Sequence, residues 1–367
     1  MAAKITVRQA ETAADRAAVY NLRYQLYVEM QGLFADIADH DNRWLRDALD
    51  DEATLLMAEQ DGQLIGTSRL VWGAQGFDAA LREAFDIARF TDLISEADMA
   101  VGSRFLVLPE YRQSPVPAHL FMGMAGALVE RGTEIMFGEC EPHLLNTWGR
   151  LGVRAFGVSE HPTNGMLVRV ALLPGDVEHA REIDSPLLPV LEKRSKQSFA
   201  PRRLAARLNS MQRVVGQARD RDRFWAQVEK TIAIDALARK LGGLEPAEFD
   251  ALLGNSVAIE CEPGSRLIRK GHVSRTLYIL LSGSLEVWDG DQKIVTVDGP
   301  GEVMGEVAFF SGATRMSDVL TGPEGALVLA LSDRSLQQLI GTHGSGAARF
   351  LLTITRGLCE KLHQRAR

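Results

Sequence analysis

Residues 303–319 read Val-Met-Gly-Glu-Val-Ala-Phe-Phe-Ser-Gly-Ala-Thr-Arg-Met-Ser-Asp-Val, and this stretch is the most informative part of the sequence. Gly305 stands before a short run suited to the start of a helix, where backbone N–H groups lack helical partners and can meet an anion. Glu306 offers a carboxylate to a sugar hydroxyl, and Arg315 offers a guanidinium to a phosphate. The stretch therefore predicts a site for a ligand that contains both groups.

The segment upstream has the pattern of antiparallel strands. Short apolar-rich runs cover residues 267–268, 276–281, 284–288 and 293–297. Between them stand the turn residues Gly271, Ser282-Gly283, Asp289-Gly290 and 299–301. We expect a mainly-β double-sheet roll with flanking helices.

From about Ile234 onward the chain resembles the cyclic nucleotide-binding domain family. The phosphate cassette of that family runs Gly-Glu-x-Ala-Leu and is followed by an arginine, which here corresponds to residues 305–309 and Arg315. The resemblance implies that Glu306 accepts the ribose 2′-OH and that Arg315 pairs with the cyclic phosphate. The cassette further includes Gly305 and the amides of Val307, Ala308 and Met316. The alternative is a degenerate roll that binds nothing.

Three residues after the cassette refine the expected ligand. Met316 has no hydroxyl, whereas relatives that prefer cyclic GMP often have Thr at this position, so the resemblance implies cyclic AMP (cAMP) as the effector. A strand that begins after Arg315 places Ser317 on the same face as the arginine and Asp318 on the opposite face.

The last helix is expected over residues 345–365, because its apolar side chains recur at helical spacing. They are Phe350, Leu351, Ile354, Leu358 and Leu362. In the family this helix closes over the base, with Thr353 or Thr355 as contacts. No room follows it for a helix-turn-helix, so we expect no nucleic-acid partner, and dimerisation through the helix stays open.

Composition fits two globular domains: 367 residues are 46% hydrophobic and 24% charged. No signal sequence or membrane-spanning run is visible, and Cys140, Cys261 and Cys359 lie far apart, so we expect a cytoplasmic protein without disulfides. His40 between two aspartates reads as a solvated loop, and we assign no metal and no tightly bound cofactor.

The N-terminal half reads as mixed α/β. Strands are expected at residues 5–7, 54–59, 64–70, 102–108, 134–140 and 166–172, and helices at 14–28, 118–131 and 144–151. This order resembles the GNAT acyltransferase superfamily over about Lys4 to Leu173, which implies a mixed sheet with helices on both faces and an α+β chain overall. In ordinary acetyl-CoA users, glycines after the segment equivalent to Tyr111-Arg112 cradle the pyrophosphate. Here Pro115 and Pro117 lack the required N–H, which counts against acetyl-CoA.

Several segments resemble the branch that transfers long acyl chains, which includes acyl-homoserine-lactone synthases and long-chain N-acyl amino acid synthases. They are residues 23–29, Asp47 with Asp50, residues 66–70 and residues 103–105. The resemblance implies transfer from acyl carrier protein or acyl-CoA to an amine. The donor would contact Phe105, Leu106, Val107 and Arg112.

The charged residues of these segments allow two interpretations. Arg23, Arg69 and Arg104 can hold the carboxylate of an amino-acid acceptor or the phosphate of a phosphopantetheine arm, with Asp47 and Asp50 orienting the acceptor ammonium. Alternatively, the five residues form structural ion pairs, or Asp47 and Asp50 simply cap a solvated helix. Both interpretations stay open.

Two residues depart from the expected catalytic groups. Val101 stands where autoinducer synthases have a glutamate base, so Glu96, Asp98 or water must take the proton, and Trp148 replaces a tyrosine acid. Catalysis then rests on proximity and on polarisation of the thioester carbonyl by strand amides. Phe105, Val107, Phe121 and Met122 line an acyl channel or simply belong to the core.

A basic connector separates the two halves, which we place at residues 1–192 and 234–367. Between Lys193 and Arg223 stand ten Lys or Arg and two Asp, although the whole chain is −7. The connector docks an acidic carrier protein or a membrane surface, or is a solvated helix. Its apolar residues share one helical stripe. They are Leu204, Leu208, Met211 and Val215.

The sequence thus predicts an N-acyltransferase regulated by a cyclic nucleotide. Two alternatives are a cAMP-regulated protein lysine acetyltransferase that uses acetyl-CoA and a non-catalytic binding module.

Overall fold

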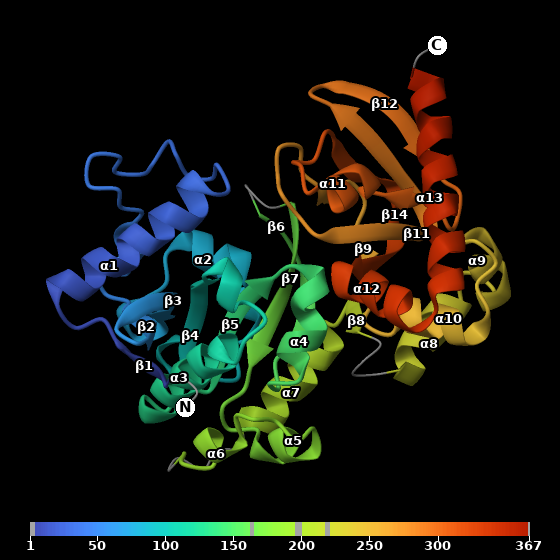
Figure 1. Ribbon diagram of the computed structural model, residues 1–367. Coiled ribbons are helices and arrows are strands. Elements are labelled where there is room, and N and C mark those ends of the chain that lie inside the picture. Colours follow the sequence, from blue (N-terminus) through green and yellow to red (C-terminus); the bar gives the residue numbers. More distant parts are fainter. Residues whose placement is uncertain (1–3, 162–164, 195–199, 217–220, 366–367) are drawn as a thin grey trace. The chain divides into compact units, whose positions relative to one another are not determined.

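A computed structural model describes residues 4–161, 165–194, 200–216 and 221–365 (Figure 1). The chain forms two compact units. One contains residues 1–139, 150–154 and 170–210, and the other contains residues 140–149, 155–169 and 211–367. Within the described ranges, no helix is both long and apolar enough to cross a membrane. The domain boundaries inferred from composition stay a prediction.

The first sheet has seven strands in the order β1-β2-β3-β4-β5-β7-β6. The strands are β1 (Ile5–Gln9), β2 (Thr54–Gln60), β3 (Gln63–Trp72), β4 (Met99–Val107), β5 (Ile135–Cys140), β6 (Arg154–His161) and β7 (Gly165–Leu172). The first four strands pair antiparallel, and β4 pairs parallel with β5. Asp61 and Gly62, both with positive φ, make the tight turn of the β2–β3 hairpin. The sequence pattern did not reveal β6.

Helices cover this sheet, and Figure 1 shows α1 (Ala13–Arg23) and α3 (Val116–Glu130) on either side of strands β1 to β4. Thr12 and Asp15 form a capping box at the start of α1. The helix expected at 14–28 is α-helical only to Arg23, and a π-helical turn follows at Tyr24–Glu29. The remaining helices are α2 (Ala79–Ala84), α4 (Leu145–Gly149), α5 (Val177–Glu182), α6 (Leu188–Leu191) and α7 (Ala200–Ser210).

Two irregularities shape the middle of the sheet. The β3–β4 register shifts between Thr67 and Arg69, which oppose Leu106 and Ser103, so β4 bulges at residues 104–105. The register of β4 with β5 runs from Met99 to Val101, although β4 continues to Val107 and β5 to Cys140. The two parallel strands therefore diverge beyond Val101 and leave amides of β4 outside that ladder.

The second unit contains the β-roll. Its strands are β8 (Val214–Gly216), β9 (Val257–Cys261), β10 (Arg266–Ile268), β11 (Thr276–Asp289), β12 (Gln292–Val297), β13 (Val303–Met304) and β14 (Asp318–Ser332). The order is β12-β11-β14-β9-β8, with β10 on β14 and β13 on β11. The turn expected at Ser282-Gly283 is wrong, because β11 runs through it as one bulged strand.

Helices pack around the roll and complete its core. They are α8 (Arg221–Glu229), α9 (Ile234–Lys240), α10 (Pro246–Leu253), α11 (Glu306–Ser311), α12 (Asp333–Thr342) and α13 (Gly344–Arg365). Phe350 and Ile354 of α13 are buried among strand and helix residues of the roll, as the apolar stripe predicted. The stripe weakens further on, since Leu358 is half-buried. The side chain of Leu362 lies outside those that the structure describes.

The connector differs from the predicted continuous helix. Leu204 and Leu208 are buried on α7, but α7 ends at Ser210 and Val215 lies on β8, where it pairs with Ala258 of β9. β-Branched valines fit this pairing better than a helix. Much of the basic charge has local carboxylate partners. The pairs are Arg194–Glu134, Arg202–Glu178, Arg207–Asp92, Arg213–Glu262 and Arg221–Asp250.

Candidate functional sites

The cassette is built at the end of β13. Gly305 follows Met304 with φ +86°, a conformation that favours glycine, and a Cβ there would displace the guanidinium of Arg315. The chain then turns directly into α11, whose first-turn N–H groups, including those of Val307 and Ala308, have no acceptor within the helix. The segment thus forms a tight turn followed by a short helix, and its role as a phosphate cradle stays a prediction.

Arg315 is the buried cation of this site. Its side chain donates to the carbonyl oxygens of Gly305 (2.6 Å) and Thr276 (2.5 Å), and the residue is 4% exposed. Burial lowers the pKa of the guanidinium from its usual value. Among the described residues, no carboxylate lies within ion-pair distance of it. Glu141 and Glu306 act on the guanidinium electrostatically, but its hydrogen bonds go to carbonyls, so an anionic ligand can supply an ion-pair partner.

Glu306, on the first residue of α11, has a different partner. Its Oε1 accepts from Nζ of Lys361 (2.9 Å), and the same ammonium donates to the carbonyl oxygen of Val303 (2.5 Å). Lys361 lies on α13, 55 residues further along the chain. The carboxylate expected to bind the ribose is therefore ion-paired in this structure.

The neighbouring residues are only partly placed as expected. Met316 is exposed, and Ser317 is half-buried. The strand begins at Asp318, so the prediction of a strand that starts directly after Arg315 and alternates faces through Ser317 is wrong. Asp318 pairs with Arg266 (2.8 Å), which neutralises it. The hydroxyls of Thr353 and Thr355 donate to carbonyls one turn back in α13, and their role at the base stays a prediction.

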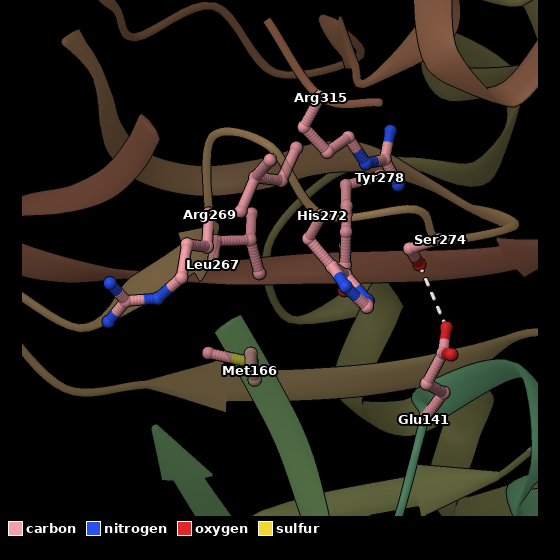
Figure 2. Close-up of a pocket in the computed structure, with 9 residues that line it drawn as sticks. Glu141, Met166, Leu267, Arg269, His272, Ser274, Tyr278 and Arg315 are labelled. Carbon is pink, nitrogen blue, oxygen red and sulfur yellow. Dashed lines mark hydrogen bonds between the residues drawn. The ribbon is translucent and has the colours of Figure 1, made fainter. Parts of the chain in front are cut away.

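A small cavity of about 10 Å³, enough for about one water molecule, borders Arg315 (Figure 2). Its wall includes His272, Ser274, Tyr278 and Glu141, and Ser274 donates to Glu141 (2.8 Å). Both ring nitrogens of His272 are buried, and neither has a hydrogen-bond partner among the described residues. The loop carrying His272 is tied to the cassette, since Arg315 N–H donates to the His272 carbonyl (2.8 Å).

The titratable groups around this cavity have pKa values shifted in different directions. Burial alone would raise the pKa of Glu141, but His143 beside it lowers that pKa to about 2. Burial lowers the pKa of His272 and raises that of Tyr278. Glu141, His272 and Lys361 could not be predicted from the sequence, because each lies far from the cassette in the chain and belongs to no local motif.

In the first unit, the five predicted charged residues meet in one cluster. Asp50 is fully buried and accepts from Arg23 (2.8 Å) and Arg69 (3.2 Å). Asp47 accepts from Arg69 (2.5 Å) and Arg104 (3.1 Å). Partial burial would raise the pKa of Asp47, but Arg69 and Arg104 hold it below its usual value. The structure thus contains the ion pairs of the second interpretation.

The cluster keeps an excess of positive charge, with three guanidiniums against two carboxylates. Arg23 Nε and Nη2 are buried without a partner among the described residues. Arg104 has φ +52° in the β4 bulge, and its guanidinium lies 4.6 Å from the ring centre of Phe34. Because of the bulge, the side chain of Arg104 does not follow the regular alternation of the strand and points towards Asp47.

The residues expected to bind the acyl donor lie on β4 and just beyond it. Leu106 and Val107 are buried, and Phe105 is half-buried with its ring centre 6.3 Å from that of Phe121. Met122 is half-buried. Arg112 is exposed and donates to the Val107 carbonyl (3.2 Å).

The start of α3 has the expected proline geometry. Pro115 is the N-cap, Pro117 lies in the first turn, and the Val116 N–H donates to Ser114 Oγ (3.2 Å). Few N–H groups remain for a pyrophosphate.

The candidate acids and bases have structural partners. Glu96 is held by Arg82 (2.9 Å) and by the N–H of Phe77 (3.0 Å), and the hydrogen bonds from Arg82 lower its pKa. Such a carboxylate is a weak base. Val101 is buried, and Trp148 is half-buried.

Comparison with known proteins identifies both halves. Residues 22–122 match the family described as Acetyltransferase (GNAT) domain, and residues 258–343 match the family described as Cyclic nucleotide-binding domain. The chain therefore contains a GNAT acyltransferase domain followed by a cyclic nucleotide-binding domain, which confirms both resemblances and the α+β fold class.

Individual proteins that resemble this chain share less than a third of their residues with it in the aligned regions. A CRP-like cAMP-activated global transcriptional regulator from Mycobacterium tuberculosis is 28% identical over 83 residues, 22% of this chain and 37% of that regulator's length. The CoA-dependent acyl-homoserine lactone synthase MesI is 22% identical and covers 53% of this chain and 96% of its own, with a TM-score of 0.39. FeeM, an N-acyl amino acid synthase from uncultured soil microbes, is 17% identical and covers 51% and 98%, with a TM-score of 0.40.

Proposed function

We propose that this protein is an N-acyltransferase whose activity is controlled by a cyclic nucleotide bound in its C-terminal domain. The observation that carries the regulatory half is Arg315, a buried guanidinium without a carboxylate partner in the described structure, set beside a Gly-Glu cassette. A cyclic phosphate supplies an ion-pair partner for this guanidinium. Met316, which has no hydroxyl, favours cAMP as the effector.

The acyltransferase half is proposed to move an acyl group from a thioester to an amine. The amine nitrogen attacks the thioester carbonyl, the C–S bond breaks, and an amide and a free thiol form. Amides of β4 left outside the ladder beyond Val101 can polarise the carbonyl oxygen. Because Glu96 is tied to Arg82, the amine proton leaves through water.

The acceptor is proposed to be an amino acid. The cluster around Asp47 has one more positive charge than negative, and Arg104 stands at its more accessible side. An acceptor carboxylate balances that charge, while Asp47 can orient the ammonium. Arg23 and Asp50 are too deeply buried to touch a substrate and are proposed to position Arg69.

The donor is proposed to be a long-chain thioester of acyl carrier protein or CoA. Pro115 and Pro117 remove N–H groups at the start of α3 that an ordinary acetyl-CoA site uses. Several arginines of the connector have acidic partners within their own unit, so docking of a carrier protein or a membrane through the connector is not part of the proposal. Location in the cytoplasm stays a prediction.

The test measures thiol release from long-chain acyl carrier protein, long-chain acyl-CoA and acetyl-CoA, each with mixed amino acids, with and without cAMP. We expect turnover of a long-chain donor that changes with cAMP. Turnover of acetyl-CoA alone would instead support a lysine acetyltransferase. Silence with every donor would leave a binding module.

A pair of variants tests the nucleotide site. Arg315→Ala should weaken cAMP binding at least about 100-fold, because it removes a charge-assisted pair in a buried site. Arg334→Ala removes an exposed arginine from α12 of the same domain and should leave binding unchanged. Unchanged binding in Arg315→Ala would reject the site.

A further inference from the structure

The ion pair between Lys361 and Glu306 occupies the carboxylate that a ribose needs. The side chain of Glu306 is 8% exposed and that of Lys361 is 31% exposed, so the pair is partly shielded from water. Lys361 also donates to the carbonyl of Val303, next to the cassette. An ammonium is a stronger partner for a carboxylate than a neutral hydroxyl.

The same contact holds the end of α13. Near its start the helix is anchored by Arg349 on Glu248 and by the buried side chains of Phe350 and Ile354. Beyond Ile354, no described side chain of α13 is fully buried. Lys361 is therefore the main polar anchor between the last turns of this helix and the cassette.

We propose that Lys361 is an internal competitor for the ribose-binding carboxylate, so that binding of a cyclic nucleotide exchanges the Lys361–Glu306 pair for a ribose–Glu306 hydrogen bond. The exchange releases only the last turns of α13, which follow the part of the helix with Thr353 and Thr355 that is expected at the base. This inference rests on the proposed nucleotide site and names how that site is regulated. The 2′-OH is the only ligand group that competes with Lys361. A nucleotide without it gains the phosphate contact but leaves the pair in place.

The first test compares cAMP with 2′-deoxy-cAMP by calorimetry. Lys361→Met should bind cAMP about tenfold more tightly, because the hydroxyl no longer displaces an ammonium from a shielded carboxylate. Binding of 2′-deoxy-cAMP should change less than about twofold. The preference for the 2′-OH therefore grows in the variant.

Matched variants separate competition from other effects. Arg356→Met removes an exposed cation from the same helix and should change neither affinity. Lys361→Gln keeps a hydrogen-bond donor for Glu306 without the charge, and its cAMP affinity should lie between those of wild type and Lys361→Met. This variant also tests the proposal if Lys361→Met fails to fold. Weaker cAMP binding in Lys361→Met, or equal shifts for both nucleotides, would overturn the proposal.

A second readout needs no nucleotide. Cys359 is exposed and lies two residues from Lys361, whereas Cys140 and Cys261 are buried, so a spin label can be directed to the end of α13. Label mobility should rise in Lys361→Met without ligand and in wild type with cAMP. Unchanged mobility in ligand-free Lys361→Met would reject the anchor. If neither wild type nor Lys361→Met binds any cyclic nucleotide, the proposed regulation by a nucleotide is rejected. The label still reports whether Lys361 holds the end of α13 in the ligand-free protein. Cys359→Ser controls for labelling at other cysteines.

Discussion

Replacing Asp50 by asparagine should destabilise the acyltransferase fold severely while keeping the shape of the side chain. Asp50 is 0% exposed and accepts from Arg23, which is 1% exposed, and from Arg69. Its second oxygen accepts from the N–H of Asp47 (3.0 Å), which closes a capping box. The substitution leaves two buried guanidiniums with less counter-charge.

The magnitude follows from this geometry. Removing one partner of a buried ion pair costs about 3–5 kcal/mol. With a urea dependence of about 2.5 kcal/mol per molar, the unfolding midpoint of this unit should fall by about 1–2 M. The neighbouring substitution Asp51→Asn is the control, because Asp51 is 60% exposed in a surface pair with Arg46 and should change stability by less than about 1 kcal/mol.

The assay is urea unfolding of the full chain at pH 7, followed by circular dichroism and by tryptophan fluorescence, because the two units can unfold separately. A wild-type midpoint for Asp50→Asn would refute the assignment of Asp50 as the buried anchor of the cluster. A midpoint lowered equally for both would point to an effect of net charge and refute it as well.

Two further predictions concern single residues of the two sites. Arg104→Ala should lower acyl transfer at least about tenfold and raise the KM of the amino acid without changing cAMP affinity, since the residue faces the proposed acceptor and lies outside the nucleotide domain; retained turnover in the thiol-release assay would exclude it from the site. His272 is buried beside Glu141, Arg315 and His161, and burial lowers its pKa below 6.5 in the folded protein. As the pH falls, the imidazole is therefore protonated first in the unfolded chain. The stability that is fully present above pH 6.5 is lost as the pH falls through the folded pKa. His272→Gln should flatten the fall in thermal midpoint below pH 6.5, and an unchanged slope would show that another group titrates.

Local sequence was enough for much of the fold. Most strands of the first sheet and the helices that pack on it were predicted from alternation and helical spacing. In the roll, the turn at Asp289-Gly290 between β11 and β12 was placed correctly. β6 was missed because it is a half-exposed edge strand in which Arg154, Gly157 and Glu160 dilute the apolar pattern. At β8, pairing with β9 outweighed the helical spacing of the connector.

The cassette could be predicted from the sequence alone, because Gly305, Glu306 and Arg315 lie within one short segment. The contacts of these charged groups could not be predicted in this way, because their partners lie far away in the sequence. Lys361 reaches Glu306 from 55 residues away, and Asp50 meets Arg23 and Arg69 across separations of 27 and 19 residues. Charge pairing over such distances depends on how helices and strands pack, and no local spacing encodes which arginine a buried carboxylate will meet.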